Sequence, residues 1–154
     1  MKSPDALNAV AEFHRVFRVP APTSPAIPAP ERCRLRVNLL QEELNELQQA
    51  IADGDLVEVA DALADLQYVL SGAVLEFGLG NRFKALFDEV HRSNMSKTCG
   101  SPAEAEATLA HYRALDQDGR VERSGDHYLV FRTADNKVLK NVNYSPADLA
   151  AQLK

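Results

Sequence analysis

Cysteine is almost absent from the sequence: Cys33 and Cys99 are the only two in 154 residues. They lie far apart and form no Cys-x-x-Cys pair, so neither a zinc site nor a disulfide framework is expected. Such cysteine usage is typical of a reduced compartment. We therefore expect a cytoplasmic protein.

Long apolar runs and an excess of positive charge are missing as well. The longest uncharged run of the central helix, residues 66–75, is too short to cross a bilayer, and the first residues contain no apolar signal segment. The formal net charge is −5, which argues against nucleic acid as a partner. Neither nucleic acid nor a membrane is therefore expected. An anionic ligand stays compatible with this charge if metal ions lie between ligand and protein.

Helical periodicity is what the first two thirds of the chain do contain. Apolar residues recur at helical spacing over about residues 4–17, 31–53 and 56–77, and "NRFKALFDEVHRSN" predicts a fourth helix. "VPAPTSPAIPAP" holds five of the eight prolines and predicts an irregular connector. The "ADGD" segment predicts a helix end, with Asp55 as the N-cap of the next helix.

The character of the sequence changes after residue 97. Residues 102–115 predict a short surface helix, and Tyr128–Arg132 with Lys137–Val142 predict a β-hairpin around the turn residues "ADN". Ser145 as N-cap, followed by a proline, predicts a short terminal helix. The sequence therefore predicts an all-α fold: a bundle of four to five helices over residues 1–97, and an extension with a small hairpin over residues 98–154.

Six carboxylates mark the second and third helices. At about 100° per residue, Glu42 and Glu46 share one side of the second helix, and Glu43 lies at the edge of its apolar stripe. The acids of the third helix fall within about 60° of one another; they are Glu58, Asp61 and Asp65. Because a short break joins the helices, they are natural antiparallel neighbours.

Two explanations of these acids compete. Solvated faces would account for the glutamates, since Glu is a good helix former, but Asp is a poor residue inside a helix. Carboxylates crowded together repel one another unless a cation neutralises them. Oxygen ligands without Cys or His select Mg²⁺, with Mn²⁺ as a substitute. A di-iron bundle would need Glu-x-x-His pairs, which the sequence lacks.

Magnesium ions on carboxylates commonly hold phosphate oxygens and activate a water. Such chemistry also needs donors for the phosphates, and "HRSNMSK" offers Arg92, Asn94 and Lys97. The alternative for this segment is an ordinary basic helix end that complements the helix dipole.

The order of these motifs resembles a known superfamily. "EELNE" followed by "EVADALADLQYVLSG" is similar to the paired Glu-Glu-x-x-Glu and Glu-x-x-Asp motifs of the all-α, MazG-like nucleoside triphosphate pyrophosphohydrolases, and "DEVHRSNMSK" to the Asn/Lys segment that follows them. The connector and "EFHRVF" resemble a branch with members that prefer dUTP. The resemblance covers about residues 11–97. It implies a MazG-like bundle completed by dimerisation, as a homodimer or a dimer of dimers.

The resemblance also implies an activity. The enzyme would hydrolyse the α–β phosphate bond of a (deoxy)nucleoside triphosphate and release the monophosphate and pyrophosphate. Glu43 and Glu46 would be Mg²⁺ ligands, and Glu42 a ligand or the base that orients the water. Asp65 matches the aspartate of the second motif.

One position departs from the motif: the usual glutamate three residues before Asp65 is Ala62. Asp61 or Glu58 must supply the missing carboxylate, and residues 58–61 themselves spell Glu-x-x-Asp. The sequence leaves open which of the three acids of this helix bind metal directly.

Substrate contacts are implied for further residues. Lys97 and Asn94 would contact phosphate or sugar, with Lys97 also counted as catalytic, whereas Arg92 is either a substrate contact or half of a surface salt bridge. His14 lines a base pocket or serves the core. A last pair, Lys137 and Lys140, either closes over the phosphates or is a pair of solvated hairpin lysines.

Three functions stay open from the sequence. The first is a Mg²⁺-dependent pyrophosphohydrolase that removes unwanted nucleotides, with dUTP favoured by resemblance alone. The second is a biosynthetic enzyme similar to phosphoribosyl-ATP pyrophosphohydrolase. The third is a helical interaction module that keeps the fold without activity, which Ala62 makes worth testing.

Overall fold

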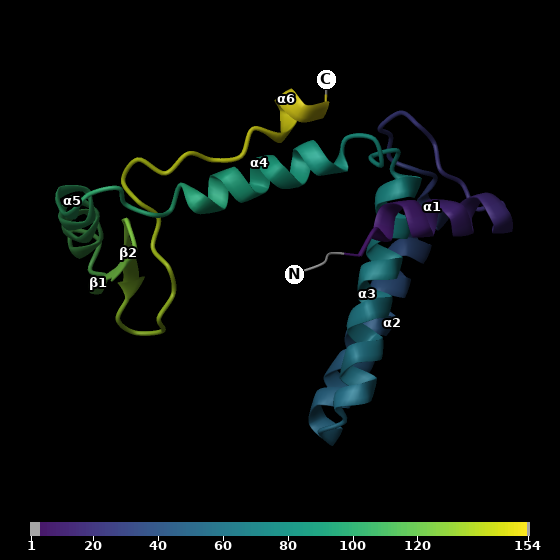
Figure 1. The fold of residues 1–154 in the computed structure, drawn as a ribbon, viewed down its shortest axis with the longest axis horizontal. Helices are drawn as coiled ribbons and strands as arrows, with labels where there is room; N and C mark the ends of the chain where they lie inside the picture. Colours follow the sequence, from purple (N-terminus) through teal and green to yellow (C-terminus); the bar gives the residue numbers. More distant parts are fainter. Residues whose placement is uncertain (1–3, 154) are drawn as a thin grey trace. The chain divides into compact units, whose positions relative to one another are not determined.

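The computed structural model describes residues 4–153, and within them six helices and one two-stranded sheet (Figure 1). The chain forms two compact units, one ending at Phe83 and the other starting at Lys84. The predicted mostly helical fold with a small hairpin is confirmed. A functional division at residue 97 stays a prediction.

The first unit is built on a helical hairpin. Helices α2 (Pro30–Asp53) and α3 (Leu56–Glu76) run side by side in opposite directions (Figure 1). The sharp reversal uses Gly54 at φ 69°, and the carboxylate of Asp55 then accepts hydrogen bonds from the backbone N–H groups of Val57 and Glu58. These bonds confirm Asp55 as the predicted N-cap. They supply acceptors for N–H groups in the first turn of α3, which have no partner within the helix.

A seven-residue spacing describes the seam between these helices. Ala50 of α2 and Ala62 of α3 are buried, and their small side chains allow a close approach of the two backbones. On α2, the seam positions one and two heptads before Ala50 are Glu43 and Arg36. On α3, the seam position two heptads after Ala62 is Glu76. The seam is therefore apolar and narrow near the reversal and carries charged side chains further along.

Helix α1 (Ala6–Phe17) packs on α3 and buries Val10 and His14. The proline-rich segment that follows it is irregular, as predicted. Its Ala26 donates a backbone hydrogen bond to the carbonyl of Phe77, just after α3 ends. The connector is thus fixed to the end of α3 by a backbone contact.

The second unit has a small core of its own. Helices α4 (Phe83–Met95) and α5 (Pro102–Arg113) lead into strands β1 (Gly119–Ser124) and β2 (His127–Arg132). α5 packs against both strands. The buried apolar side chains of this core are Cys99, Ala105, Leu109, Val130 and Leu139.

The predicted hairpin is wrong in its partner strand. β2 is confirmed, but it pairs with β1 through the two-residue loop Gly125–Asp126, whereas the predicted strand 137–142 makes one isolated bridge to β2. The segment leaves the sheet after that bridge because Asn141 is buried, where its Nδ2 donates to the carbonyl of Thr98 and to a Glu104 oxygen.

The predicted start of the terminal helix is also wrong. α6 (Leu149–Leu153) begins after Asp148, whose carboxylate accepts from the backbone N–H of Ala151. Ser145 instead donates its backbone N–H to the hydroxyl of Ser96 and accepts from Arg92 at its own hydroxyl. These contacts hold residue 145 in an extended connection rather than in a cap. No helix within residues 4–153 is long and apolar enough to span a membrane.

Gly78→Ala is expected to destabilise the first unit strongly. Gly78 has φ 68°, and a Cβ there would lie 2.0 Å from the backbone carbonyl oxygen of Ser24. Gly54 has a similar φ of 69°, but a Cβ there would meet no atom within 4 Å, so Gly54→Ala isolates the cost of the left-handed backbone. We expect about 1 kcal/mol for Gly54→Ala and at least about 2–3 kcal/mol for Gly78→Ala, measured by urea unfolding. Equal losses would show that the contact with Ser24 is unimportant.

Candidate active site

Six carboxylates line the reversal and middle of the α2–α3 hairpin, and we call them the acidic cluster. They are Glu42, Glu43, Glu46, Glu58, Asp61 and Asp65. Five of them are exposed, and only Glu43 is half-buried. The structure therefore brings the acids of both predicted motifs together along one seam.

Glu43 is the carboxylate with the least favourable surroundings. Its Oε2 is buried and has no hydrogen-bond partner in the described part of the chain. Burial raises the pKa of Glu43, and the negative charges of Glu46, Asp65, Glu42 and Asp61 raise it further, in that order. A cation bound beside Glu43 would contact the unpartnered oxygen and would neutralise the repulsion between Glu43 and the four neighbouring carboxylates.

The acidic cluster fits a magnesium ion better than it fits a fully protein-ligated metal. Among residues 4–153, no three His, Cys, Asp or Glu side chains are grouped as a ready-made metal site. Mg²⁺ needs no such group, because it keeps several waters and is commonly held by one or two carboxylates together with substrate phosphates. The unpartnered oxygen of Glu43 and the all-oxygen donor set match that requirement.

The structure gives Ala62 a packing role. It is buried in the seam, with 3% of its surface exposed, whereas Glu58, Asp61 and Asp65 remain exposed. Asp61 and Asp65 both act on the charge of Glu43, and Glu58 lines a small hollow together with Glu46. Both candidates for the missing carboxylate, Asp61 and Glu58, therefore lie close to glutamates of α2, as does Asp65.

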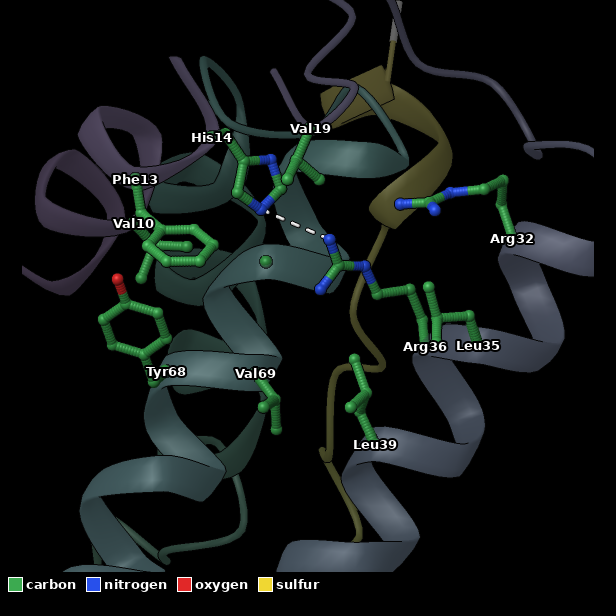
Figure 2. Close-up of a pocket in the computed structure, with 11 residues that line it drawn as sticks. Val10, Phe13, His14, Val19, Arg32, Leu35, Arg36, Leu39, Tyr68 and Val69 are labelled. Atoms are coloured by element: carbon green, nitrogen blue, oxygen red, sulfur yellow. Dashed lines mark hydrogen bonds between the residues drawn. The ribbon is translucent and has the colours of Figure 1, made fainter. Parts of the chain in front are cut away.

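A largely apolar pocket lies further along the same unit, where α1 crosses α3 (Figure 2). It has a volume of about 340 Å³. Phe13 and Tyr68 form one wall, with their rings edge to face at 5.8 Å. Arg32, Arg36 and His14 form the charged and polar part of the lining (Figure 2). His14 thus lines a pocket but is also buried in the interior of the unit, so both of its interpretations stay open.

A buried charge network holds this end of the first unit. His14 Nδ1 donates to the carbonyl of Pro20 at 3.0 Å, so its Nε2 is free to accept from Arg36 at 3.2 Å. Burial lowers the pKa of His14, and the nearby Arg36 adds to this effect. The imidazole is therefore neutral at physiological pH. Gly72 makes room for the pair, since a Cβ there would lie 2.6 Å from an Arg36 nitrogen.

Glu76 completes the network and was missed by the sequence analysis. It is 2% exposed and accepts hydrogen bonds from Arg32 and, at 2.9 Å, from Arg36. Burial alone would raise the pKa of Glu76, but the hydrogen bonds from the two arginines outweigh it and the pKa lies below the ordinary range. One carboxylate among the apolar residues at the end of α3 was the signal available in the sequence.

The expected phosphate-binding residues all belong to the second unit. Arg92 donates to Glu89, to the hydroxyl of Ser145 and to the carbonyl of Pro146, so it anchors the C-terminal segment. The hydrogen bonds from Arg92, with one from the backbone of Asp148, lower the pKa of Glu89 to about 2.

Lysines of the second unit share one hollow. Lys97 donates to the side-chain oxygen of Asn94 at 2.7 Å. The same Lys97 lines a hollow with Lys137 and Lys140. The structure therefore brings together three of the residues that the sequence analysis expected at phosphates, although 40 positions separate the first from the next in the chain.

Comparisons with known proteins agree with this geometry. The family model for phosphoribosyl-ATP pyrophosphohydrolase matches residues 10–94. An uncharacterized protein of Acanthamoeba polyphaga mimivirus, L479, is 32% identical over an alignment that covers 87% of this chain and 90% of the viral protein. The chain belongs to the phosphoribosyl-ATP pyrophosphohydrolase family, which is part of the MazG-like superfamily that the motifs resemble. It is a hydrolase of the pyrophosphohydrolase type.

Glu43→Gln is expected to stabilise the metal-free protein at neutral pH, because it removes a half-buried charge from the field of four other carboxylates. We expect about 1 kcal/mol, which corresponds to a Tm increase of about 2–4 °C in EDTA. Folding raises the pKa of Glu43, so the stability gained by the substitution is complete at pH values above the pKa in the folded protein. The gain decreases as the pH falls through the folded pKa, and it is lost below the unfolded value of 4.5.

Glu31→Gln is the matched control for this measurement. Glu31 lies in the first turn of the same helix, outside the acidic cluster, where a negative charge favours the helix dipole. It should therefore leave Tm unchanged or lower it slightly. A Tm that falls equally in both variants would contradict the account of Glu43.

Proposed function

We propose that the protein is a Mg²⁺-dependent nucleoside triphosphate pyrophosphohydrolase that cleaves the α–β phosphate bond and clears unwanted nucleotides. The observation that carries the proposal is Glu43, whose buried oxygen lacks a partner in the described part of the chain while four carboxylates act on its charge. A protein of net charge −5 needs a cation between these acids and a triphosphate. The family membership supports the reaction type.

Members of the acidic cluster would act either as metal ligands or as the general base. Glu43, Glu46, Asp61 and Asp65 would hold the metal, with Glu58 joining Glu46 at the hollow that both line. Glu42 is exposed and would accept the proton of the attacking water. The chemistry that a bound Mg²⁺ supplies at such a site is charge for the phosphate oxygens and a lower pKa for the water; Mn²⁺ should substitute.

The pocket of Figure 2 is our candidate for the base. Phe13 and Tyr68 offer aromatic surface, and the neutral His14 is oriented by Pro20 and Arg36. A pocket of about 340 Å³ lies at the lower end of the range for small-ligand sites, which favours a single pyrimidine base such as the uracil of dUTP. Asn94 and Lys97 would contact phosphate or sugar, with Lys97 adding positive charge for catalysis. Arg92 is instead held in an ion pair with Glu89, the alternative that the sequence left open for it.

A homodimer or a dimer of dimers is part of the proposal. The hairpin leaves apolar side chains exposed on both helices, among them Ile51, Leu63 and Leu70. A second hollow, with a volume of about 480 Å³, lies between Leu63 and the start of α1. Association of two copies would cover such a surface, because large exposed apolar patches are rare on monomers. We also propose a cytoplasmic location, on the reduced cysteines.

Phosphoribosyl-ATP is the second candidate substrate, because the matching family model is named for its hydrolysis. It contains the same type of phosphate anhydride, so the acidic cluster would serve either substrate. The two candidates differ in what the base pocket must accept.

The deciding experiment is pyrophosphate release from a panel of ribo- and deoxynucleoside triphosphates and phosphoribosyl-ATP, in Mg²⁺, Mn²⁺ or EDTA. We expect metal-dependent release, with dUTP the best substrate. In heavy-oxygen water the label should enter one of the two products once per turnover, which confirms hydrolysis of a single anhydride bond. Phosphoribosyl-ATP as the best substrate would select the second candidate.

Glu46→Gln should lower kcat/KM by at least about 100-fold, because it removes a negative charge from the proposed metal site. The variant should keep the fold of the protein. Glu31→Gln, which makes the same change elsewhere on α2, should leave kcat/KM unchanged. Circular dichroism of both variants checks the fold. Full activity of Glu46→Gln would contradict the metal assignment, and no release from any substrate by a folded, metal-binding protein would favour an interaction module.

A further inference from the structure

A hollow with only basic charges on its wall lies in the second unit. Its volume is about 220 Å³, and we call it the basic hollow. The lining residues are Lys97, Tyr112, Gln117, Arg132, Lys137, Val138, Leu139 and Lys140. No acidic side chain of the described residues lines it. The second unit as a whole has ten Lys and Arg against ten Asp and Glu, so this concentration of positive charge is local.

The three lysines lack carboxylate partners in the described residues. Lys97 donates to the amide oxygen of Asn94, and Lys140 lies 4.4 Å from the centre of the Tyr144 ring. The ammonium of Lys137 makes no hydrogen bond or ion pair within residues 4–153. Like charges held near one another raise the energy of the free protein, and an anion between them would reverse that cost.

Arg132 is the exception, because it is already neutralised. Its Nε donates to Asp135 at 2.8 Å, and its Nη2 donates to the other oxygen of the same carboxylate. These bonds, with a further one from the backbone N–H of Lys137, lower the pKa of Asp135 to about 2, and the charges of Arg132 and Lys137 add to the effect. Asp135 is therefore ionised at every physiological pH and withdraws one positive charge from the hollow.

The backbone that carries the lysines is fixed by the core of the unit. Leu139 is buried, and its N–H donates to the carbonyl of Val130 at 2.8 Å. The N–H of Lys140 donates to the hydroxyl of Tyr112 at 3.1 Å, which leaves that hydroxyl hydrogen available for an acceptor. The hollow is thus a preformed frame lined by three lysines, with a hydroxyl donor among its lining residues.

We propose that the basic hollow binds an oligophosphate, a chain of two or three phosphoryl groups. Its volume lies below the range of about 300–1,000 Å³ for drug-sized ligands, so it suits the phosphates rather than a whole nucleotide. Three ammonium groups without carboxylate partners match the multiple charges of such a chain. The ligand is either the phosphate chain of the substrate or free pyrophosphate; only the first source rests on the proposed function.

The first test titrates the full-length protein with inorganic pyrophosphate by calorimetry in EDTA. Without metal the acidic cluster repels the anion, so binding reports on the basic hollow and requires no turnover. We expect one site per chain, weakened by added salt. Lys137→Gln and Lys140→Gln should each weaken binding about 5- to 10-fold, because each removes one charge close to the ligand.

Lys84→Gln is the matched control. Lys84 pairs with Asp88 on α4 and does not line the hollow, but its loss changes the net charge of the protein by the same amount. It should leave the affinity within about 2-fold. Asp135→Asn should act in the opposite direction and tighten binding about 3-fold, because it frees Arg132 while an oxygen remains for the N–H of Lys137.

The next arm identifies the source of the phosphates. If the substrate supplies them, Lys137→Gln and Lys140→Gln raise KM while kcat changes little; if free pyrophosphate does, KM is unchanged and inhibition by pyrophosphate is lost. Either result supports an oligophosphate site.

Three results would overturn the proposal. The first is that the protein does not bind pyrophosphate. The second is that Lys84→Gln weakens pyrophosphate binding as much as Lys137→Gln and Lys140→Gln do. The third is that a short single-stranded oligonucleotide binds more tightly than pyrophosphate at the same salt concentration. An inactive enzyme that still binds pyrophosphate at these lysines would refute only the proposed function.

Discussion

Repulsion among carboxylates along the α2–α3 seam is the constraint on which the other features of the site depend. Glu43 stands at an inward heptad position, so packing of the hairpin necessarily takes one carboxylate partly out of water. Four other members of the acidic cluster keep it in a negative field. Such an arrangement weakens the free protein, and the cation that we propose would turn the same charges into stabilising contacts. A stability cost of this kind is common at functional sites.

The end and the middle of the hairpin treat buried charge in different ways. At the α1 end, Glu76 is nearly inaccessible but is bonded to Arg32 and Arg36, so its charge is compensated within the protein. Removal of one partner from a buried pair commonly costs about 3–5 kcal/mol. In the middle of α2, Glu43 has no such partner among the described residues. The compensated end contributes to a pocket, and the uncompensated middle is where we propose that a cation binds.

The sequence predicted those features that depend on local chemistry. The apolar period located α2 and α3 within one or two residues, and the short break located the cap at Asp55. Helical spacing alone placed the six carboxylates on neighbouring faces, and in the structure four of them act on the charge of Glu43. Their roles as ligands or base stay predictions, since no metal or substrate contact is needed to fold the hairpin.

Features that depend on tertiary contacts were missed or misplaced. The strand β1 reads "GRVERS", whose polar alternation is weak, so its pairing was assigned to residues 137–142 instead. The loop Gly125–Asp126 was the signal that would have found it. The sequence around Ser145 is typical of an N-cap, but hydrogen bonds with Arg92 and Ser96 hold this residue in an extended connection before the helix. The burial of Glu76 depends on arginines that lie 40 or more positions away in the chain.

Crystals grown with Mn²⁺ and a nucleotide analogue that cannot be cleaved between its α- and β-phosphates would test the central claim most directly. The anomalous signal of manganese identifies the metal without reference to activity. We predict a peak in contact with Glu43 and with at least one of Asp61 and Asp65, with phosphate oxygens completing its coordination. Nucleotide bound with no manganese at Glu43, or manganese bound only at other carboxylates, would contradict the assignment of Glu43 as a metal ligand.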